Sequence, residues 1–399
     1  MARIFFGRLR SYSKVLFLSA LLLGGGSTPS GYAWENHKEI TRLSLSGWDQ
    51  WEDPIIEPLE NVLPFLESEG NRFSDRSRFN SYLQINTSKA FWDEPPPLPQ
   101  GADSQALTIL AWSSEIPSAG MDHDLALSAD QEFLGGQQGP LSYLYRHMYL
   151  LAFDWRQPLL TFHYPHSKEV VGQGADRAQL FFNFAVQAKK AKHWYWAYRF
   201  LGLALHYFED INEPYYCQQF GSVALLPWGL LIRGKTAFLK ESFRVVTNYR
   251  VAYEHYGSFL LKKSIPGIGG SNSGPRDLDD VFRVPRATAI FKQNLETQTE
   301  LSVVAAGALA ARAAAMLAPS AVGAQMGLMA KDFEDHKIDL QTGFTDAAGK
   351  PKLDFEKYES SRVKEHMRHR ELLYDSLAET YSNTGVAARW LFDRFRNAP

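Results

Sequence analysis

The stretch that most constrains how this chain can fold runs from Gly202 to Pro214 and reads GLALHYFEDINEP. It closes an aromatic, apolar segment that starts near His193 and has no helix breaker before Gly202, which predicts a long buried helix that Pro214 terminates. His206 and Asp210 stand four residues apart, so an imidazole and a carboxylate share one helical face and can bind one metal ion. A buried polar group without a partner costs roughly 2–7 kcal/mol. Asp210 therefore needs either a metal ion or a hydrogen bond from His206.

The first 33 residues have the features of a secretory signal peptide. Four cations precede the apolar run Val15–Leu23, and Gly31 and Ala33 are the small residues that a signal peptidase reads. Cleavage after Ala33 makes Trp34 the first residue of the mature chain. The apolar run is too short for a permanent span and no cysteine follows it to accept a lipid, so we expect a secreted or periplasmic protein without a transmembrane anchor.

Composition limits the partners that the mature chain can have. Without the four leader cations it carries 38 basic and 44 acidic residues, a net charge of −6. This mild acidity argues against a protein built on broad attraction to nucleic-acid phosphates. Cys217 is the only cysteine, which excludes an intrachain disulfide and a thiolate metal cluster.

Helical patterns account for most of the mature chain and predict an all-α, multi-helix bundle. An alanine-rich segment that contains Arg312 is expected to be a packed bundle helix and not a membrane span. The last helical region is expected to break at 383–385, where the sequence is Asn-Thr-Gly. Besides the helix that begins near His193, the expected helices are Asp176–Lys192, Glu241–Leu261, Leu301–Leu317 and Ser360–Arg396.

The expected organisation has four parts. Residues 1–33 are the signal peptide, and residues 34–262 form a helical metal domain. Residues 263–286, rich in Gly, Ser, Pro and charge, form a loop or linker. Residues 287–399 supply C-terminal helices that pack on the same domain.

Four further side chains outside the first stretch are candidate metal ligands. His37 follows the new N-terminus, whose amino group has a pKa near 8 and can bind a metal together with its own carbonyl; alternatively, His37 simply occupies a first helical turn. Asp122 and Asp124 lie in a turn-forming stretch where such residues are usually solvated. His147 lies among aromatic residues, where a histidine is often a hydrogen-bonded part of the core.

Taken together, these residues resemble the zinc-dependent phospholipase C and single-strand nuclease superfamily, which includes the catalytic domain of clostridial alpha-toxin. In that family signal cleavage exposes a tryptophan that binds zinc, and the organising helix reads GxxxHYxGDxxxPxH. The resemblance covers about Trp34 to Tyr256. Its matching positions are Gly202, His206, Tyr207, Asp210 and Pro214, the segment 146–149 (Arg-His-Met-Tyr) that resembles an HFYDP-type segment, and the Gly120-Met121-Asp122 turn.

The resemblance implies two zinc ions that share the Asp210 carboxylate. One would be held by Asp122, His147, His206 and Asp210, with Asp124 as the alternative to Asp122. The other would be held by the Trp34 terminus, His37 and Asp210. A water bridging two such ions is acidified, which would give a hydroxide for in-line attack on phosphorus.

The chain departs from the family at the third zinc site, whose ligands are His, His and Glu. Tyr216 and Arg250 stand at the histidine positions and only Glu254 remains. A guanidinium keeps its proton and cannot bind a metal, so either Arg250 replaces that zinc as the charge that grips a phosphate oxygen, or the activity is lost. Arg250 and Glu254 can also be read as a surface ion pair. Leu144 replaces an aromatic associated with choline recognition, so phosphatidylcholine specificity is not expected.

The resemblance therefore predicts an exported zinc-dependent phosphoester hydrolase, phospholipase C-like, acting on a phospholipid or another phosphoester, with possible peripheral contact to a membrane. Asp122, Asp210 and Arg250 are the expected catalytic residues. Two alternatives remain: a catalytically degraded, zinc-stabilised binding or scaffold protein, which the replaced third site favours, and a single-strand nuclease. The nuclease is less favoured because no basic, aromatic stretch marks a strand-binding groove.

Overall fold

A computed structural model gives the fold of the chain. It describes residues 36–48, 51–85, 91–99, 103–122, 146–149, 172–218, 235–264, 301–334, 338–340, 344–346 and 348–399, with the single residues 225, 229, 232, 295 and 297. The expected signal peptide, Trp34, Asp124, Leu144 and most of the expected linker lie outside the described residues.

The described residues are mostly helical, which confirms the expected all-α class. A two-residue antiparallel pair, β1 (Glu67–Ser68) with β2 (Asn71–Arg72), lies between two short 3-10 turns and the third helix. The short turns are η1 (Leu59–Asn61), η2 (Leu63–Phe65) and the π-helical η3 (Pro117–Met121). The helices are α2 (His37–Leu45), α3 (Arg76–Leu83), α4 (Gln105–Ser114), α6 (Gly174–Lys190), α7 (Trp194–Asp210), α8 (Pro214–Cys217), α9 (Lys235–Ser264), α12 (Val303–Glu334), α13 (Phe355–Glu359) and α14 (Lys364–Asn397).

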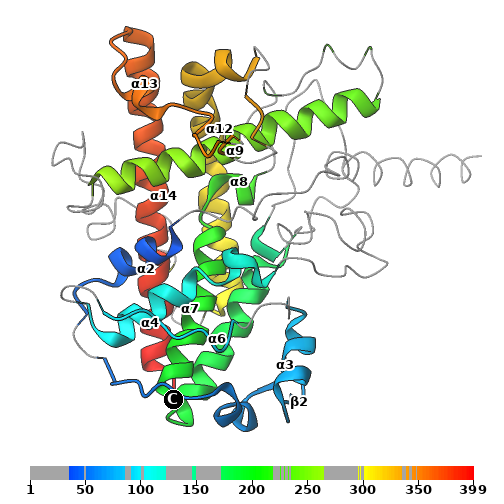
Figure 1. Cartoon of the computed structure of the whole chain (residues 1–399), viewed down its shortest axis with the longest axis vertical. Helices are drawn as coiled ribbons and strands as arrows, with labels where there is room; N and C mark the ends of the chain where they lie inside the picture. Colours follow the sequence, from blue (N-terminus) through cyan, green and yellow to red (C-terminus); the bar gives the residue numbers. More distant parts are fainter. Residues whose placement is uncertain are drawn as a thin grey trace, which may run out of the picture.

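Two apolar cores organise these helices, and the two long helices α12 and α14 contribute to both. The first core packs α4, α6 and α7 against the N-terminal half of α12 and the C-terminal end of α14. The second packs α9 against the C-terminal half of α12 and the N-terminal half of α14. In Figure 1, α14 runs along the long axis of the molecule and α9 lies across it. α2 packs against α4, α7 and α14.

The organising helix ends earlier than the sequence predicts. α7 stops at Asp210, and Pro214 is the first residue of the separate short helix α8. The Glu213 side chain caps α8 by accepting a hydrogen bond of 2.9 Å from the backbone N–H of Tyr216. The expectation that Pro214 terminates the helix was wrong because proline fits the first position of a helix, where its missing N–H is not needed.

Two other helices run further than expected. α12 continues through Pro319 to Glu334, well beyond Leu317. α14 has no break at 383–385: Thr384 lies inside the helix, and its hydroxyl donates to the Thr380 carbonyl at 2.8 Å. The predicted break was wrong because this stretch is buried from all sides, and packing outweighs weak helix propensity.

Among the described residues, the segment Val303–Phe333 of α12 is long and apolar enough to cross a membrane, with a mean hydropathy of 1.5 over an 18-residue window. Its two halves belong to the two apolar cores, and the helix packs against α6, α8, α9 and α14. Its exposed side includes Met316. Core packing between helices therefore accounts for part of its apolar character, since 39% of its most apolar 18-residue window is buried.

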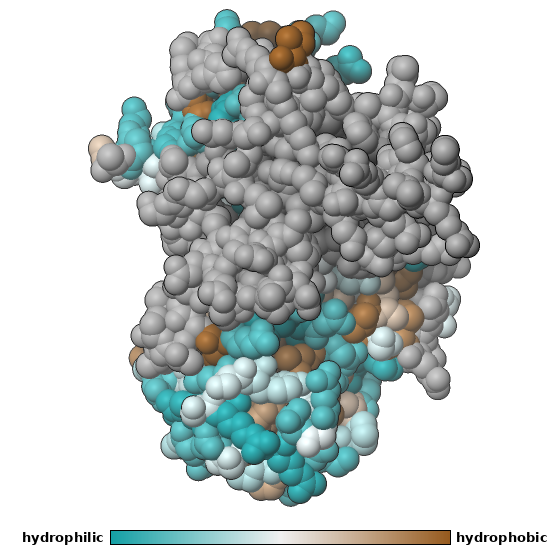
Figure 2. Space-filling model, turned by 90° about the vertical axis from the view of Figure 1, so that its right-hand side faces the viewer, coloured by the Kyte–Doolittle hydropathy of each residue, from teal (hydrophilic) through white to brown (hydrophobic). Residues whose placement is uncertain are grey.

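Figure 2 shows the described surface at one end of the molecule. Its atoms are mostly hydrophilic, with hydrophobic atoms in small groups. This distribution is ordinary for a protein surface that faces water.

Candidate metal centre

His206 and Asp210 come from the last two turns of α7, and a glycine one turn earlier lets another helix approach them. A Cβ atom on Gly202 would lie 2.4 Å from the Leu110 carbonyl oxygen and 2.7 Å from the Ser113 side chain, so α4 packs directly on the α7 backbone. Only glycine allows this approach. The end of α4 thereby reaches the side chain of His206.

The contact with α4 fixes which nitrogen of His206 carries the proton. His206 Nδ1 lies 2.6 Å from the Ser114 carbonyl oxygen, which can only accept, so Nδ1 donates. In the neutral ring Nε2 then carries a lone pair, and this atom lies 3.1 Å from Asp210 Oδ2. Two acceptors that face each other in a buried site need positive charge between them, which a metal ion can supply, or a proton on the neighbouring His147 Nδ1 that lies 3.0 Å from His206 Nε2.

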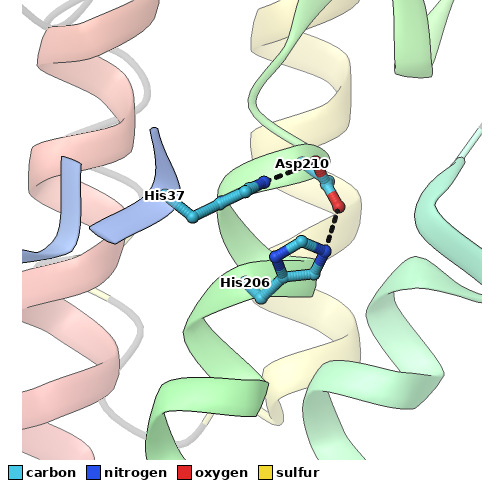
Figure 3. Close-up of side chains that lie close together, drawn as sticks. All are labelled: His37, His206 and Asp210. Carbon is cyan, nitrogen blue, oxygen red and sulfur yellow. Dashed lines mark ion pairs between the residues drawn. The ribbon is translucent and has the colours of Figure 1, made fainter. Parts of the chain in front are cut away.

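His37, in the first turn of α2, approaches the other oxygen of Asp210. Its Nε2 lies 3.3 Å from Asp210 Oδ1. Its Nδ1 lies 2.7 Å from Glu209 Oε2, and the Thr41 hydroxyl donates to Glu209 Oε1 at 2.6 Å. Figure 3 shows His37 reaching from α2 toward His206 and Asp210 on α7. All of these side chains are buried.

His147 approaches from the segment 146–149, which crosses the start of α6. Gly172 has a φ of 122°, and a Cβ there would lie 2.0 Å from the Met148 carbonyl oxygen; a Cβ on Gly174 would lie 2.9 Å from the His147 carbonyl oxygen. The backbone N–H of Gly174 donates to the Met148 carbonyl at 3.1 Å. These two glycines let the segment lie against α6. Its histidine places Nδ1 2.6 Å from Asp210 Oδ2 and 3.0 Å from His206 Nε2.

This donor set fits a transition-metal ion of the zinc class. The side chains of His37, His206 and Asp210 form one buried group whose ligand atoms all lie within 4.8 Å of one another. Bonds of about 2.0–2.2 Å to zinc would put the ligand atoms of a tetrahedral site about 3.3–3.5 Å apart. The separations of 3.0, 3.1 and 3.3 Å among these atoms and His147 need only small outward movements. His147 Nδ1 and Asp210 Oδ2, which are 2.6 Å apart, would have to separate further to bind the same ion. Imidazole and carboxylate donors suit zinc and its neighbours in the first transition row.

Burial and the neighbouring charges shift the pKa values of the residues in this centre. Burial alone lowers the pKa of His37, but Asp210 and Glu209 outweigh it and raise that pKa to about 10. Burial and the nearby charge of His37 lower the pKa of His206 to about 3, so this ring stays neutral. Burial raises the pKa of Glu209 to about 7 against the pull of His37 and Thr41. Although burial opposes it, the imidazoles around Asp210 keep its pKa well below the usual value.

Asp122 lies beyond His147, where two buried arginines hold it. Its Oδ1 accepts from Arg146 at 3.0 Å and from Arg177 at 3.1 Å, and its Oδ2 accepts from the Tyr207 hydroxyl. His147 Nε2 lies 3.3 Å from the same Oδ2. Burial raises the pKa of Asp122, but the two guanidinium groups outweigh it and hold the carboxyl ionised.

A second polar cluster joins α8 to α9. Arg250 donates to Glu254 at 2.7 Å and to the Tyr216 hydroxyl at 3.2 Å, and all three residues are buried. Burial lowers the pKa of Arg250, but Glu254 and Tyr216 outweigh it and raise it. The interpretation as a surface ion pair was therefore wrong. The structure brings together the three positions that the resemblance assigns to a third zinc, with a guanidinium among them.

The structure thus gathers the imidazoles of His37, His147 and His206 around the Asp210 carboxylate, with Asp122 behind His147. Glu254 and Arg250 lie in the neighbouring cluster, while Trp34 and Asp124 lie outside the described residues. Sequence reasoning missed the Ser114 carbonyl, Glu209 and Arg177. Glu209 had a signal: it stands where the family pattern has glycine, immediately before Asp210.

Comparison of the chain with models of known protein families, with curated proteins and with solved structures finds no match. The functional argument therefore depends on the chemistry of the residues in these two clusters.

Proposed function

We propose that this chain is an exported, zinc-dependent phosphoester hydrolase with the helical fold of the phospholipase C type. The observation that carries the proposal is the meeting of His206 Nε2 and Asp210 Oδ2 at 3.1 Å, with His206 Nδ1 committed to the Ser114 carbonyl. A lone pair and a carboxylate oxygen that face each other in a buried site can share a metal ion, with His147 Nδ1 as a further donor 2.6 Å from Asp210 Oδ2; in the metal-free protein a proton on His147 Nδ1 would serve both acceptors. A hydrogen-bonded His–Asp pair would instead present the protonated nitrogen to the carboxylate.

In this proposal Asp210 bridges two metal ions. Its Oδ2 faces His147 and His206, and its Oδ1 faces His37, so each oxygen belongs to a different set of donors. Bound there, zinc lowers the pKa of a water molecule toward neutrality and stabilises negative charge on a phosphoryl oxygen. The protein residues hold these donors in place: the Ser114 carbonyl orients His206, and Glu209 orients His37.

Arg250 supplies the charge that the third zinc has in the family. Residues 250, 254 and 258 share one face of α9 because they are four residues apart. At one end of this face Arg250 contacts Tyr216, and at the other end Ser258 accepts a hydrogen bond from Asn36, which precedes His37. The α9 face therefore lies beside the start of α2. A guanidinium there is suited to a phosphate oxygen, which Arg binds through paired N–H groups.

The position of Asn36 also supports a role for a processed N-terminus. Two residues span at most about 7 Å, so in a chain cleaved after Ala33 the amino group of Trp34 would stay within that distance of Asn36. His37 is the next residue. Removal of the leader would thus create a metal donor close to the His37 side of the centre, as the resemblance implies, in a protein that is secreted or periplasmic.

The first experiment is to purify the mature chain, sequence its N-terminus and count bound metal by plasma mass spectrometry, with His206→Ala as the control. About two zinc ions per chain in a protein that begins at Trp34, lost in the variant, would support the centre. Phospholipids, phosphomonoesters and single-stranded nucleic acid are then assayed as substrates. A folded, processed chain without metal would contradict the proposal and favour a binding or scaffold protein.

The second experiment separates phosphate binding from metal binding. Arg250→Ala should raise KM or abolish turnover while metal content stays unchanged. Arg244→Ala is the matched control, because Arg244 lies on the same helix and pairs locally with Glu241. Unchanged kinetics in Arg250→Ala would remove Arg250 from the proposed mechanism.

A further inference from the structure

Two imidazoles of the metal centre are oriented in the same way. His206 presents Nε2 to Asp210 and gives Nδ1 to the Ser114 carbonyl at 2.6 Å. His37 presents Nε2 to Asp210 and gives Nδ1 to Glu209 at 2.7 Å. In both, one nitrogen faces the shared carboxylate and the other is held by an acceptor outside the centre. Metal-binding histidines are commonly oriented in this way, and the acceptor fixes the tautomer.

His147 lies between two carboxylates, and each of its nitrogens faces one of them. Its Nδ1 lies 2.6 Å from Asp210 Oδ2, and its Nε2 lies 3.3 Å from Asp122 Oδ2. The imidazole ring therefore separates the two carboxylates. Because the two nitrogens of one ring point in different directions, a metal bound at Nδ1 is not within reach of a carboxylate on the Nε2 side.

We infer that Asp122 is the outer acceptor that orients His147 and is not itself a metal ligand, and that Arg146 and Arg177 are positioning residues which hold Asp122 in that role. The inference rests on the metal centre of the proposed function and deepens it. It departs from what the resemblance implies, which places Asp122 on the metal.

The surroundings of Asp122 support this assignment. Both of its oxygens already accept hydrogen bonds: Oδ1 from Arg146 and Arg177, and Oδ2 from Tyr207. A carboxylate that receives two guanidinium groups has its charge balanced without a metal.

The two arginines are themselves fixed at the end of α3. Arg146 and Arg177 both donate to the Leu83 carbonyl, at 3.1 and 3.0 Å. This carbonyl belongs to the last residue of α3, where the helix dipole is negative and favours cations. The group of Asp122 and its arginines is thus anchored to a helix that is separate from the metal centre.

A consequence follows for the chemistry. The described side chains that face the two proposed metal positions are then the three imidazoles and the one shared carboxylate of Asp210. Fewer protein ligands leave more coordination positions for water and a substrate oxygen, as hydrolytic zinc sites require.

The test compares Asp122→Asn with two reference variants of the full mature chain loaded with Co²⁺. Glu209→Gln changes an outer acceptor, and Asp210→Asn changes a ligand. Metal affinity is measured by chelator competition, and coordination by the visible absorption spectrum of Co²⁺. We expect Asp122→Asn to resemble Glu209→Gln, with affinity about 10–100-fold weaker and the ligand-field bands retained. Asp210→Asn should lose more affinity and change the bands.

Loss or rearrangement of the Co²⁺ bands in Asp122→Asn, matching Asp210→Asn, would overturn the inference while leaving the proposed hydrolase intact. Conversely, a wild-type chain that binds metal without hydrolysing any phosphoester would end the proposed function but not this assignment. A wild-type chain that binds no metal would overturn both.

A second measurement does not depend on the folding of a variant. In wild-type protein with ¹⁵N-labelled histidine and ¹¹³Cd²⁺ as the metal, the cadmium should couple to Nδ1 of His147, while Nε2 keeps its proton. Coupling to Nε2 would place the metal on the Asp122 side of the ring and overturn the inference.

Discussion

Two buried clusters, which residues 211–215 separate along the chain, meet the same electrostatic requirement in different ways. In the metal centre, Asp210 is surrounded by the imidazoles of His37, His147 and His206. In the neighbouring cluster, Glu254 is paired with Arg250. Each buried carboxylate needs positive charge. The first cluster obtains it from protons or from a metal ion, both of which exchange with solvent, and the second from a guanidinium that is part of the chain.

The difference extends to the carboxyl group that lies between the two clusters. Glu213 is fully buried, and burial together with the charge of Glu254 raises its pKa well above the usual value. The raised pKa favours a proton on Glu213, and Arg250 pairs with the Glu254 carboxylate. The second cluster is thus complete without a bound ion. Arg250 thus supplies within the chain the positive charge that a metal ion could supply, although a guanidinium cannot donate a lone pair.

The largest expected effect comes from removing the shared carboxylate. Asp210→Asn should abolish zinc binding, because both proposed ions depend on this side chain, and should lower the free energy of unfolding by about 3–5 kcal/mol, the usual cost of breaking a buried charge network. Plasma mass spectrometry and denaturant unfolding measure the two effects. Asp176→Asn, which changes an exposed carboxylate on α6, is the control. Retention of full zinc content in Asp210→Asn would show that the centre is held by other residues.

The contrast between the two clusters can also be tested in the second cluster, by replacing Arg250. The double variant Tyr216→His with Arg250→His supplies two imidazoles beside Glu254. We expect about one additional zinc ion per chain, because His and Glu are zinc ligands and arginine is not. Arg250→Gln removes the charge without adding an imidazole and serves as the control, with unchanged stoichiometry. If the folded double variant binds no more zinc than wild type, the second cluster does not have the geometry of a metal site.

A smaller effect is expected at the glycine that lets α4 approach the centre. Gly202→Ala places a methyl group 2.4 Å from the Leu110 carbonyl oxygen, so α4 must move away from α7. Overpacking of this kind costs about 1–3 kcal/mol and should also weaken zinc binding, because the Ser114 carbonyl moves with α4. Gly323→Ala on α12 is the matched control: a Cβ there meets nothing within 4 Å, and alanine should slightly stabilise the helix. Thermal unfolding and chelator competition distinguish the two variants.

The sequence predicts the part of the centre that a single helix carries. Helical periodicity predicts the all-α class, and the spacing of His206 and Asp210 predicts their common face. It does not predict the second partner of each imidazole. The Ser114 acceptor is a backbone carbonyl with no side-chain signature, and Arg177 reaches Asp122 only after α6 packs on the segment 146–149.

Helix boundaries were also misjudged where packing outweighs local propensity. α12 continues through Pro319 and α14 through Gly385, although both residues disfavour a helix interior. In the second cluster, the spacing of Arg250 and Glu254 predicts that they meet but not that they are buried. Burial depends on α8, whose position is set by the unexpected end of α7 at Asp210.

The smallest expected effect concerns the hydrogen bond that supports Glu209. Burial raises the pKa of Glu209 to about 7 even though the Thr41 hydroxyl, which donates to Glu209 Oε1 at 2.6 Å, lowers it. A carboxyl whose folded-state pKa lies above its unfolded value binds its proton more tightly when folded. Metal-free protein therefore loses stability as pH rises from about 4.5 through 7. Thr41→Val should raise the pKa further and extend this loss to higher pH, by about 1 kcal/mol at pH 8.

Unfolding of the metal-free variant and wild type at pH 5.5 and pH 8 measures this difference. Thr108→Val is the control, because the Thr108 hydroxyl bonds only to the carbonyl of Ser104 at the start of its own helix. The pH dependence that arises from His147 is common to all three proteins, whereas His37 and Glu209 are hydrogen-bonded, so the change between variants reports this coupled pair. If Thr41→Val and wild type lose the same free energy of unfolding between the two pH values, Glu209 is ionised by its neighbours without help from Thr41. The exchangeable charge of the first cluster would then be set by His37 and Asp210 alone, as the fixed charge of the second is set by Arg250.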